Sequence, residues 1–373
     1  MWGDISIAFL LAFITAFVVT PYTIRLANKV GAIDIPEKRR INEEPTPRLG
    51  GIAVIIGFLV SCIYLLTIMT LEKTFNPFGE EQYFHKLIGL LLGIIILAIF
   101  CYIDDVKGLP ALVKLLGQTI AAVVVVSFGT KIDNLTIPFL EHTLDINNSI
   151  YIYILSVGWI IGITNAINLI DGLDGLSSGI TLISCFSLII VFTMNESPII
   201  AIILITALAG AIVGFLPYNF NPAKTFIGDT GAQFLGFSLA VISILGTAKT
   251  YTLLVLISPL IILALPICDT LFAIIRRIIK GHSIKAIFAP DTGHLHHKLM
   301  KRGYTQKQAV LILYGISACL GMFAIILLES GIWKALSFAL MVIAIIAVGY
   351  KDFFKIKVNK TERSKNNMNN TNK

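Results

Sequence analysis

The chain has 373 residues, of which 56% are apolar and only 14% are charged, and its mean hydropathy is +0.85. A soluble domain of this length could not bury so much apolar surface, so the composition excludes a water-soluble globular enzyme and predicts a polytopic membrane protein. The net charge of +7 comes without a basic soluble domain, which favours anionic lipids and phosphates over nucleic acid as binding partners.

The predicted fold class is an all-α helix bundle in a single membrane domain, residues 1–350, followed by a basic, disordered cytoplasmic tail, residues 351–373. Eleven apolar segments are expected to cross the bilayer: 5–27, 50–70, 86–103, 111–128, 150–166, 176–193, 198–217, 231–246, 252–275, 308–328 and 331–350. The first segment has Asp4 before it and Arg25 and Lys29 after it, the reverse of a cleaved signal peptide. We therefore expect a retained helix.

Lysine and arginine residues set the predicted orientation. With the N-terminus outside, five of the 29 fall on the outer side and the other 24 fall in inner loops and the tail. The five outer residues are Lys73, Lys86, Lys131, Lys249 and Lys334. We therefore predict an external N-terminus and a cytoplasmic C-terminus. Polar and apolar residues alternate in the outer segment 129–149, which predicts a short hairpin there.

Under this topology, every unusual polar cluster falls on the cytoplasmic face. The clusters are Pro47-Arg48-Leu49-Gly50-Gly51, Asp104-Asp105, the run from Asn165 to Leu176, Gly228-Asp229-Thr230-Gly231 and His294-Leu295-His296-His297. Each cluster could be an ordinary loop, but their coincidence on one face predicts a functional site.

Asp104 and Asp105 follow the apolar run from Leu87 to Ile103, at a membrane edge. The C-terminal end of a helix carries partial negative charge, so two further carboxylates are unfavourable there without a cation. We predict a metal ion or a lysine beside them. The plain alternative is a pair of solvated residues at a helix end.

Asn165, Asn168, Asp171 and Asp174 follow one another at steps of three. If the segment is helical, these residues form one polar stripe at a membrane edge. The alternative is a helix break, with Asp174 as the N-cap of the next span. A single cap does not account for four spaced polar residues.

Asp229 is flanked by Gly228 and Gly231 just before an apolar span. A carboxylate with such small neighbours can bind a hard cation with little steric obstruction. The alternative is a plain N-cap of the following helix.

His294, His296 and His297 lie in a basic loop, where imidazole and lysine suit phosphate binding. A zinc site is the alternative, but no nearby acid or cysteine is spaced convincingly as a further ligand. A solvated basic loop is the plain interpretation.

Asp269 lies inside the ninth predicted span. Ionisable residues within membrane helices are functional candidates by default. The alternative is a structural ion pair with Arg276 or Arg277.

Carboxylates and basic residues at one membrane face, without a P-loop, indicate phosphate chemistry supported by Mg²⁺. The many spans indicate a lipid substrate that stays in the membrane.

The motifs resemble those of the polyprenyl-phosphate N-acetylhexosamine-1-phosphate transferases, over roughly residues 5–350. The His-x-His-His form is similar to the branch that uses UDP-N-acetylglucosamine, since the peptidoglycan branch usually carries three consecutive histidines. One departure is Asn42, where similar members often have a histidine, so no role is carried over to that position.

The resemblance implies a role for each matched residue. The catalytic residues would be Asp104, Asp105, His294, His296 and His297. The two aspartates would serve the acceptor phosphate, and the histidines would hold the phosphates or sugar of the donor. Asp229 would bind Mg²⁺, for which Mn²⁺ could substitute. The substrate-binding residues would be Arg48, Lys114, Asn165, Asn168, Asp171, Asp174 and Phe226. Phe226 would stack on the uracil, and Asp174 would contact the uracil edge.

The implied reaction is attack by the phosphate of undecaprenyl phosphate on UDP-N-acetylglucosamine, or a related UDP-N-acetylhexosamine, with release of UMP. The implied location is the plasma membrane, with the active site on the cytoplasmic face, and a homodimer is compatible with it. A two-step route through an aspartyl-phosphate is the rival mechanism. The rival functions are a CDP-alcohol phosphotransferase and a non-enzymatic transporter of lipid-linked substrates.

Overall fold

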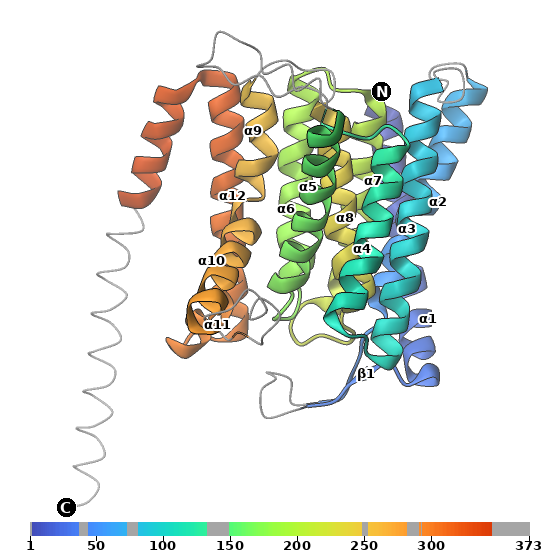
Figure 1. Cartoon of the computed structure of the whole chain (residues 1–373), viewed down its shortest axis with the longest axis vertical. Coiled ribbons are helices and arrows are strands. Elements are labelled where there is room, and N and C mark those ends of the chain that lie inside the picture. Colours follow the sequence, from blue (N-terminus) through green and yellow to red (C-terminus); the bar gives the residue numbers. More distant parts are fainter. Residues whose placement is uncertain are drawn as a thin grey trace, which may run out of the picture.

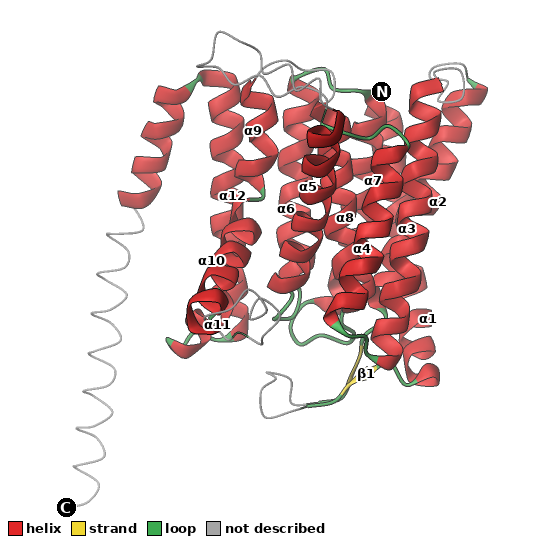
Figure 2. Ribbon diagram, in the orientation of Figure 1, coloured by secondary structure: helices red, strands yellow, loops and turns green. Residues whose placement is uncertain are grey.

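The computed structural model describes residues 2–36, 44–72, 81–132, 149–247, 253–281, 291 and 293–344. Its helices run side by side in one bundle, and the two short strands lie at one end of it (Figures 1 and 2). The strands, β1 (Ile33–Asp34) and β2 (Thr46–Pro47), pair antiparallel. The architecture agrees with the predicted all-α polytopic membrane protein.

The labelled helices take the following bounds: α1 Trp2–Val30, α2 Gly50–Leu71, α3 Glu81–Lys107, α4 Ala111–Ser127, α5 Ser149–Ile170, α6 Leu176–Met194, α7 Ile199–Asn219, α8 Gly228–Thr247, α9 Leu253–Ile262, α10 Ala264–Gly281, α11 Leu295–Lys301 and α12 Gln306–Ser330. Among the described residues, eight of these are long and apolar enough to span a membrane: α1, α2, α3, α5, α6, α7, α8 and α12. Each coincides with one predicted span. Two further apolar helices, α4 and Ile332–Ala344, are shorter.

The predicted span over 252–275 is two helices, α9 and α10, separated at Leu263. Proline explains the break, because Pro266 has no N–H to donate to the carbonyl four residues earlier. The hairpin predicted over 129–149, the tail over 351–373 and Asn42 lie wholly or mostly outside the described residues.

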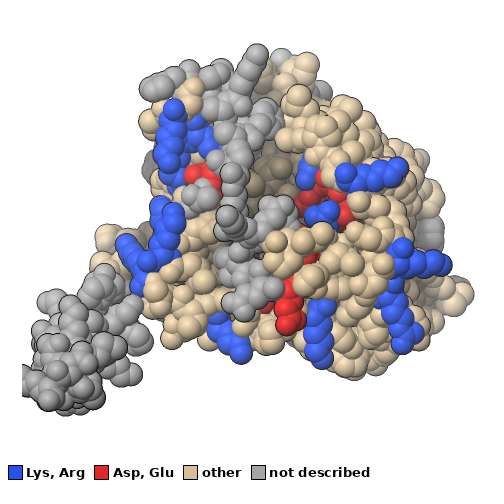
Figure 3. All heavy atoms as spheres, turned by 90° about the horizontal axis from the view of Figure 1, so that it is seen from below, with Lys and Arg blue, Asp and Glu red and all other residues tan. Residues whose placement is uncertain are grey.

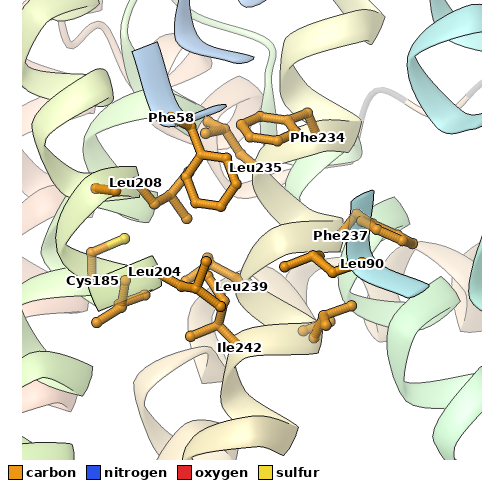
Figure 4. Close-up of a cluster of buried hydrophobic side chains, with 14 of the residues drawn as sticks. Phe58, Leu90, Cys185, Leu204, Leu208, Phe234, Leu235, Phe237, Leu239 and Ile242 are labelled. Carbon is orange, nitrogen blue, oxygen red and sulfur yellow. The ribbon is translucent and has the colours of Figure 1, made fainter. Parts of the chain in front are cut away.

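The centre of the bundle is formed by α7 and α8, which other helices enclose. Apolar side chains from α2, α3, α6, α7 and α8 meet there (Figure 4). Phe58 of α2 and Phe234 of α8 pack edge to face, with ring centroids 5.5 Å apart, a favourable aromatic geometry. The N-terminus of α8 is therefore held by a rigid core.

Small residues bring α2 close to α8. A Cβ atom on Gly51 would lie 2.2 Å from the Cα of Gly231, so neither helix tolerates a side chain at this crossing. The contact fixes the beginning of α2 beside the beginning of α8. The ends of α3, α5 and α7 and the beginnings of α4 and α6 lie at the same end of the bundle (Figure 1).

Candidate active site

A cavity of about 490 Å³ opens at this end of the bundle. Its lining combines charged side chains with backbone from five parts of the chain: Asp34, Arg48, Asp105, Lys114, Asp171, Gly172, Leu173, Asp174, Asn219, Phe226, Ile227, Gly228, Asp229 and His297. Viewed along the bundle from this end, acidic atoms lie in a recessed area with lysine and arginine side chains around it (Figure 3). The cavity therefore brings together members of all five sequence clusters.

The Asp105 carboxylate holds the N-terminus of α8. One oxygen accepts a hydrogen bond from the backbone N of Asp229 at 2.9 Å. The other accepts from the backbone N and hydroxyl of Thr230, at 2.9 and 2.6 Å. Asp105 is buried and supplies α8 with the capping acceptor that a neighbouring residue would ordinarily provide.

Lys114, at the beginning of α4, bridges two carboxylates. Its Nζ forms ion pairs with Asp104 Oδ2 and with Asp229 Oδ2, the latter at 2.7 Å. The other Asp104 oxygen accepts a hydrogen bond from the backbone N of Leu109 at 2.6 Å. The cation predicted beside Asp104 is therefore present as a lysine, which also neutralises Asp229.

Arg48 joins the first loop to the end of α3, and Gly228 brings the beginning of α8 against the same loop. Arg48 Nε donates to the backbone oxygen of Asp105 at 2.9 Å, and its Nη1 lies 4.0 Å from Asp34 Oδ1. Gly228 has φ +69°, and a Cβ atom there would lie 2.0 Å from the carbonyl oxygen of Arg48. Only glycine fits this backbone conformation and approach. Phe226 lines the cavity, and its backbone N donates to Pro47 O at 2.8 Å.

Asp171 and Asp174 lie in the loop after α5, which ends at Ile170, so the predicted stripe is not one continuous helix. Asp174 accepts hydrogen bonds from Asn221 Nδ2 at 2.8 Å and from the backbone N of Ala223 at 3.1 Å. The alternative interpretation of Asp174 as an N-cap is wrong, because Gly175 occupies that position without a side-chain bond.

Asp171 accepts a hydrogen bond from Ser177 Oγ at 2.6 Å. Burial raises the pKa of the Asp171 carboxyl to about 7, because desolvation disfavours the charged form, and the nearby Asp229 and Asp105 add to the effect. A carboxyl with such a pKa can change protonation near neutral pH.

Asn165 and Asn168 lie on α5 outside the lining of this cavity. The Asn165 amide instead bonds the side chain of Gln118 on α4, with Nδ2 2.6 Å from Gln118 Oε1. The substrate-binding role predicted for Asn165 therefore has no direct contact with the cavity to support it.

The three histidines at α11 differ in their burial and in their contacts. His297 lines the cavity, whereas His294 and His296 are buried. His294 Nδ1 is hydrogen-bonded to Asp269 Oδ2 at 2.8 Å, and its ring stacks on that of His296 at a centroid distance of 5.7 Å. His296 packs against Gly172, where a Cβ atom would meet its Nε2 at 2.3 Å.

Burial lowers the pKa of His296 to about 3 and also lowers the pKa of His297, since a charged imidazolium is poorly solvated there. His296 is therefore neutral at physiological pH. Within the described residues, no group of three His, Cys, Asp or Glu side chains is arranged to hold a metal ion, so a zinc cage has no support there.

Asp269 contacts the histidine segment rather than Arg276, which lies about two turns further along α10. Its second oxygen accepts a hydrogen bond from the backbone N of Leu295 at 2.9 Å. Arg276 instead forms an ion pair with Asp291 at 2.7 Å, and this pair lowers the pKa of Asp291. The alternative interpretation of Asp269 as an ion-pair partner of Arg276 is therefore wrong, and Asp269 instead fixes the beginning of α11.

A hard cation fits best at Asp229. Its side chain is 30% exposed, and its oxygen donors suit Mg²⁺. Mg²⁺ is commonly bound by one or two carboxylates together with substrate phosphates rather than by a complete protein cage. The absence of such a cage among the described side chains is compatible with that mode of binding.

Two polar lining residues, as well as the apolar Ile227, escaped the sequence analysis. Asp34 precedes the first loop and Asn219 ends α7, and neither belongs to a motif of unusual composition. Asp34 could have been noticed as an acid close to the first basic loop. No local signal marks Asn219, which receives a hydrogen bond from Ser178 Oγ at 2.8 Å.

Fold and site together define an integral membrane protein with an acid-rich, lysine-bridged cavity at one end of its bundle, an arrangement suited to a membrane-embedded transferase. Residues 87–247 match the family model described as Glycosyl transferase family 4. The chain belongs to the polyprenyl-phosphate N-acetylhexosamine-1-phosphate transferase family.

Three relatives illustrate the similarity. The chain is 39% identical over 336 residues to the probable undecaprenyl-phosphate N-acetylglucosaminyl 1-phosphate transferase of Bacillus subtilis (strain 168), which covers 89% of this chain and 87% of that protein. It is 33% identical to the decaprenyl-phosphate N-acetylglucosaminephosphotransferase of Mycobacterium tuberculosis (strain ATCC 25618 / H37Rv), over 81% of this chain and 77% of that protein. It is 31% identical to the phospho-N-acetylmuramoyl-pentapeptide-transferase of Bacillus cytotoxicus, over 88% of this chain and 97% of that protein.

Proposed function

We propose that this enzyme transfers N-acetylglucosamine-1-phosphate, or a related N-acetylhexosamine-1-phosphate, from a UDP-sugar to undecaprenyl phosphate. An oxygen of the lipid phosphate attacks the sugar-bearing phosphorus, the bond to the bridging diphosphate oxygen breaks, and UMP leaves. The product is a lipid-diphosphate sugar that initiates a cell-envelope polymer. The names of two relatives support a polyprenyl-phosphate acceptor and the transfer of phosphorylated N-acetylglucosamine, with undecaprenyl phosphate named for one and decaprenyl phosphate for the other.

The observation that carries the proposal is the position of Lys114 between Asp104 and Asp229 at the membrane end of the bundle. Phosphoryl transfer requires mainly positioning of the reactants and neutralisation of their charge. Lys114 offsets one of the two carboxylate charges and presents its ammonium in the cavity that the two anionic phosphates must enter. The adjacent Arg48 and His297 extend that polar surface.

The acceptor phosphate would lie beside Asp104. A phosphate monoester has its second pKa near 6 and is mostly dianionic at neutral pH, so a strong base is not required. Asp104 would accept a residual proton from the acceptor or orient the Lys114 ammonium. Asp105 would act indirectly, by holding Asp229 and Thr230 in position. A covalent aspartyl-phosphate on Asp104 is the competing route.

The nucleotide would occupy the part of the cavity between Phe226 and Asp174. The Phe226 ring offers a stacking surface for uracil, and the Asp174 carboxylate offers acceptors for the uracil N–H. Asp171 and His297 would face the diphosphate and sugar. His294 and His296 would support His297 through α11, because both are buried away from the cavity lining.

Asp229 would hold Mg²⁺ together with the diphosphate of the donor. The metal, when bound, would neutralise charge on the diphosphate and the leaving UMP. The partly exposed Asp229 carboxylate and its small neighbours support this assignment. Mn²⁺ has the same preference for oxygen ligands and would substitute.

The cavity would face the cytoplasm, where UDP-sugars are made. The distribution of lysine and arginine supports this orientation, with the N-terminus outside, eleven spans in one domain over residues 1–350 and a cytoplasmic tail over 351–373. In a cysteine-accessibility scan, position 298 should react from the cytoplasmic side and position 81 from outside. Reaction of both from one side would exclude this topology.

Membranes that contain the protein should be incubated with radiolabelled UDP-sugars, undecaprenyl phosphate and Mg²⁺, and then extracted with butanol. The proposal expects UMP release and label in the butanol phase, strongest with UDP-N-acetylglucosamine. EDTA and Asp229→Asn should each abolish both signals while the protein still inserts. Full activity in EDTA would exclude the metal, and CMP release from a CDP-alcohol would establish a different enzyme.

A further inference from the structure

A second polar cluster lies one helical turn deeper in the bundle. Gln118 of α4, Asn165 of α5 and Gln233 of α8 bond one another through their amides. Gln118 and Asn165 exchange two hydrogen bonds, of 2.6 and 3.3 Å. Gln118 Nε2 also donates to Gln233 Oε1 at 2.9 Å. We call these three residues the amide network.

Two members of the amide network are shielded from solvent, and the third, Asn165, is partly buried. Gln118 is 3% exposed and Gln233 1% exposed. Gln233 Nε2 is buried without a hydrogen-bond partner among the described residues. An unpaired donor is expensive in an apolar environment, and three apolar side chains would pack there without that cost. Its presence points to a task that depends on directed hydrogen bonds.

The network lies one helical turn further into the bundle than the two carboxylates that Lys114 bridges. Gln118 follows Lys114 by four residues on α4, and Gln233 follows Asp229 by four residues on α8, so each pair shares one helix face. The two helices are therefore joined by two successive polar contacts. The contact nearer the end of the bundle is Lys114 with Asp229, and the deeper contact is Gln118 with Gln233.

Packing against α3 and α5 places α4 in the bundle, and the two polar contacts join α4 directly to α8. Both α4 and α8 pack against α3 and against α5, which lie between them. Rotation of α4 about its axis would separate Lys114 from Asp229 without disturbing the contact between α3 and α8. Asn165 bonds Gln118 from α5 and so restrains that rotation from a third side.

We propose that the amide network is a positioning device, in which Gln118, Asn165 and Gln233 fix the rotation of α4 and thereby hold the Lys114 ammonium between Asp104 and Asp229. Asn165 then serves the site through Gln118, without contacting substrate. The geometric part of the proposal, that the network fixes the position of Lys114, rests on these contacts alone. The catalytic part, that this position affects turnover, rests on the proposed function.

The geometric part is tested by the chemical reactivity of Lys114. The full-length protein in detergent, without substrate, is treated briefly with acetic anhydride, and acetylation of each lysine is measured by mass spectrometry. An ammonium held by two carboxylates reacts slowly. Gln118→Met and Gln233→Met keep the side-chain length but remove the amide, and each should raise the acetylation rate of Lys114 about tenfold, in line with its loss of fixed ion pairs. The exposed Lys107 and Lys224 are internal references and should not change.

Two variants separate positioning from general packing. Ser238→Ala removes a buried hydroxyl, deeper on the same helix, that has no hydrogen-bond partner among the described residues, and it should leave Lys114 protected. Gln233→Glu keeps an acceptor oxygen for Gln118 Nε2 and should also retain protection. If the Met variants do not accumulate, Gln118→Asn, whose amide is one methylene too short, takes their place.

Kinetics test the catalytic part. Gln118→Met and Gln233→Met should lower kcat by roughly ten- to a hundredfold with KM for the UDP-sugar within about twofold of wild type, because misplacement of a reacting group mainly affects turnover. The double variant should lose no more than the worse single variant, as expected for residues that act as a unit.

Unchanged Lys114 acetylation in Gln118→Met and Gln233→Met would overturn the proposal, as would equal exposure of Lys114 in Gln233→Glu and Gln233→Met. A chain that releases no UMP with any donor would remove the proposed function and leave the labelling result intact. Altered acetylation with wild-type kcat would restrict the network to a structural role and reject its catalytic part.

Discussion

Asp105 and Thr230 are 125 residues apart in the chain, yet one oxygen of the Asp105 carboxylate accepts hydrogen bonds from both the backbone N and the hydroxyl of Thr230. Its neighbour Asp104 contacts Lys114 instead. Two adjacent aspartates therefore have separate tasks, one in building the site and one in facing its cation.

Replacement of Asp105 by alanine should destabilise the protein. The change leaves the first N–H groups of α8 without acceptors, and loss of such a cap costs about 2 kcal/mol. Thermal unfolding in detergent should begin at a distinctly lower temperature for Asp105→Ala than for Asp104→Ala. Equal unfolding temperatures for Asp105→Ala and wild type would contradict the capping role.

Lys114→Met should slow turnover and tighten metal binding at the same time. Loss of the ammonium removes charge stabilisation and should lower kcat by about 10²–10³-fold. It also removes a cation that competes for Asp229 Oδ2, so half-maximal activation should need less Mg²⁺. UMP release against Mg²⁺ concentration measures both quantities. Lys107→Met, at an exposed position on the preceding helix, is the control, and a matching Mg²⁺ shift there would argue for a general surface-charge effect.

Asp104→Asn distinguishes proton acceptance from covalent catalysis. If Asp104 accepts a residual proton, the variant should lose about 10²–10⁴-fold in rate. The defect should shrink above pH 7, where the lipid phosphate ionises without help. If Asp104 forms an aspartyl-phosphate, the loss should be near total at every pH. A profile of kcat against pH decides, and a wild-type rate at pH 6 would remove Asp104 from the chemistry.

Asp171→Asn should lose activity and gain stability at alkaline pH. The pKa of Asp171 is about 7 in the folded protein, above its usual 3.8, so the native state binds this proton more tightly than the unfolded state. Stability therefore falls as pH rises from about 4 to 7, and the full penalty remains above 7. Asparagine avoids the penalty and keeps an acceptor for Ser177.

Melting temperatures without divalent cations test this sign. Asp171→Asn should exceed wild type by a few degrees at pH 8 and by less at pH 5. A variant that is less stable than wild type at pH 8 would show that Asp171 is held ionised by partners in the native state.

Apolar length alone was enough to predict most of the bundle. Eight predicted spans coincide with long apolar helices, because a run of about 20 apolar residues has few other stable arrangements in a bilayer. Length could not predict the break at Leu263. That break depends on the missing N–H of Pro266, which interrupts a segment of uniform hydropathy.

The sequence predicted which charged residues form the site, but it did not predict the contacts among them. Charged motifs identified Asp104 and Asp229, the family resemblance added Lys114 as a substrate-binding residue, and the structure brings these three together. The capping of α8 by Asp105 could not be foreseen, since it depends on how distant helices pack. Gln118 and Gln233 escaped notice because neutral amides within apolar runs attract less attention than charges. An amide at such depth is itself a signal.

The partners of Asp104 and Asp105 have a consequence for biosynthesis. Lys114 follows Asp104 by ten residues, so that ion pair can form as soon as α4 leaves the ribosome. The acceptors of Asp105 are used only by α8, 124 residues later, a delay of roughly 6 to 25 seconds at about 5–20 residues per second. During that interval Asp104 has its counter-ion, whereas Asp105 lacks the N–H groups of α8 that it binds in the finished protein. A nascent chain arrested before α8 would thus carry, at the membrane surface, a carboxylate that lacks its hydrogen-bond donors. Quality control could distinguish an unfinished transferase from a complete one by this feature.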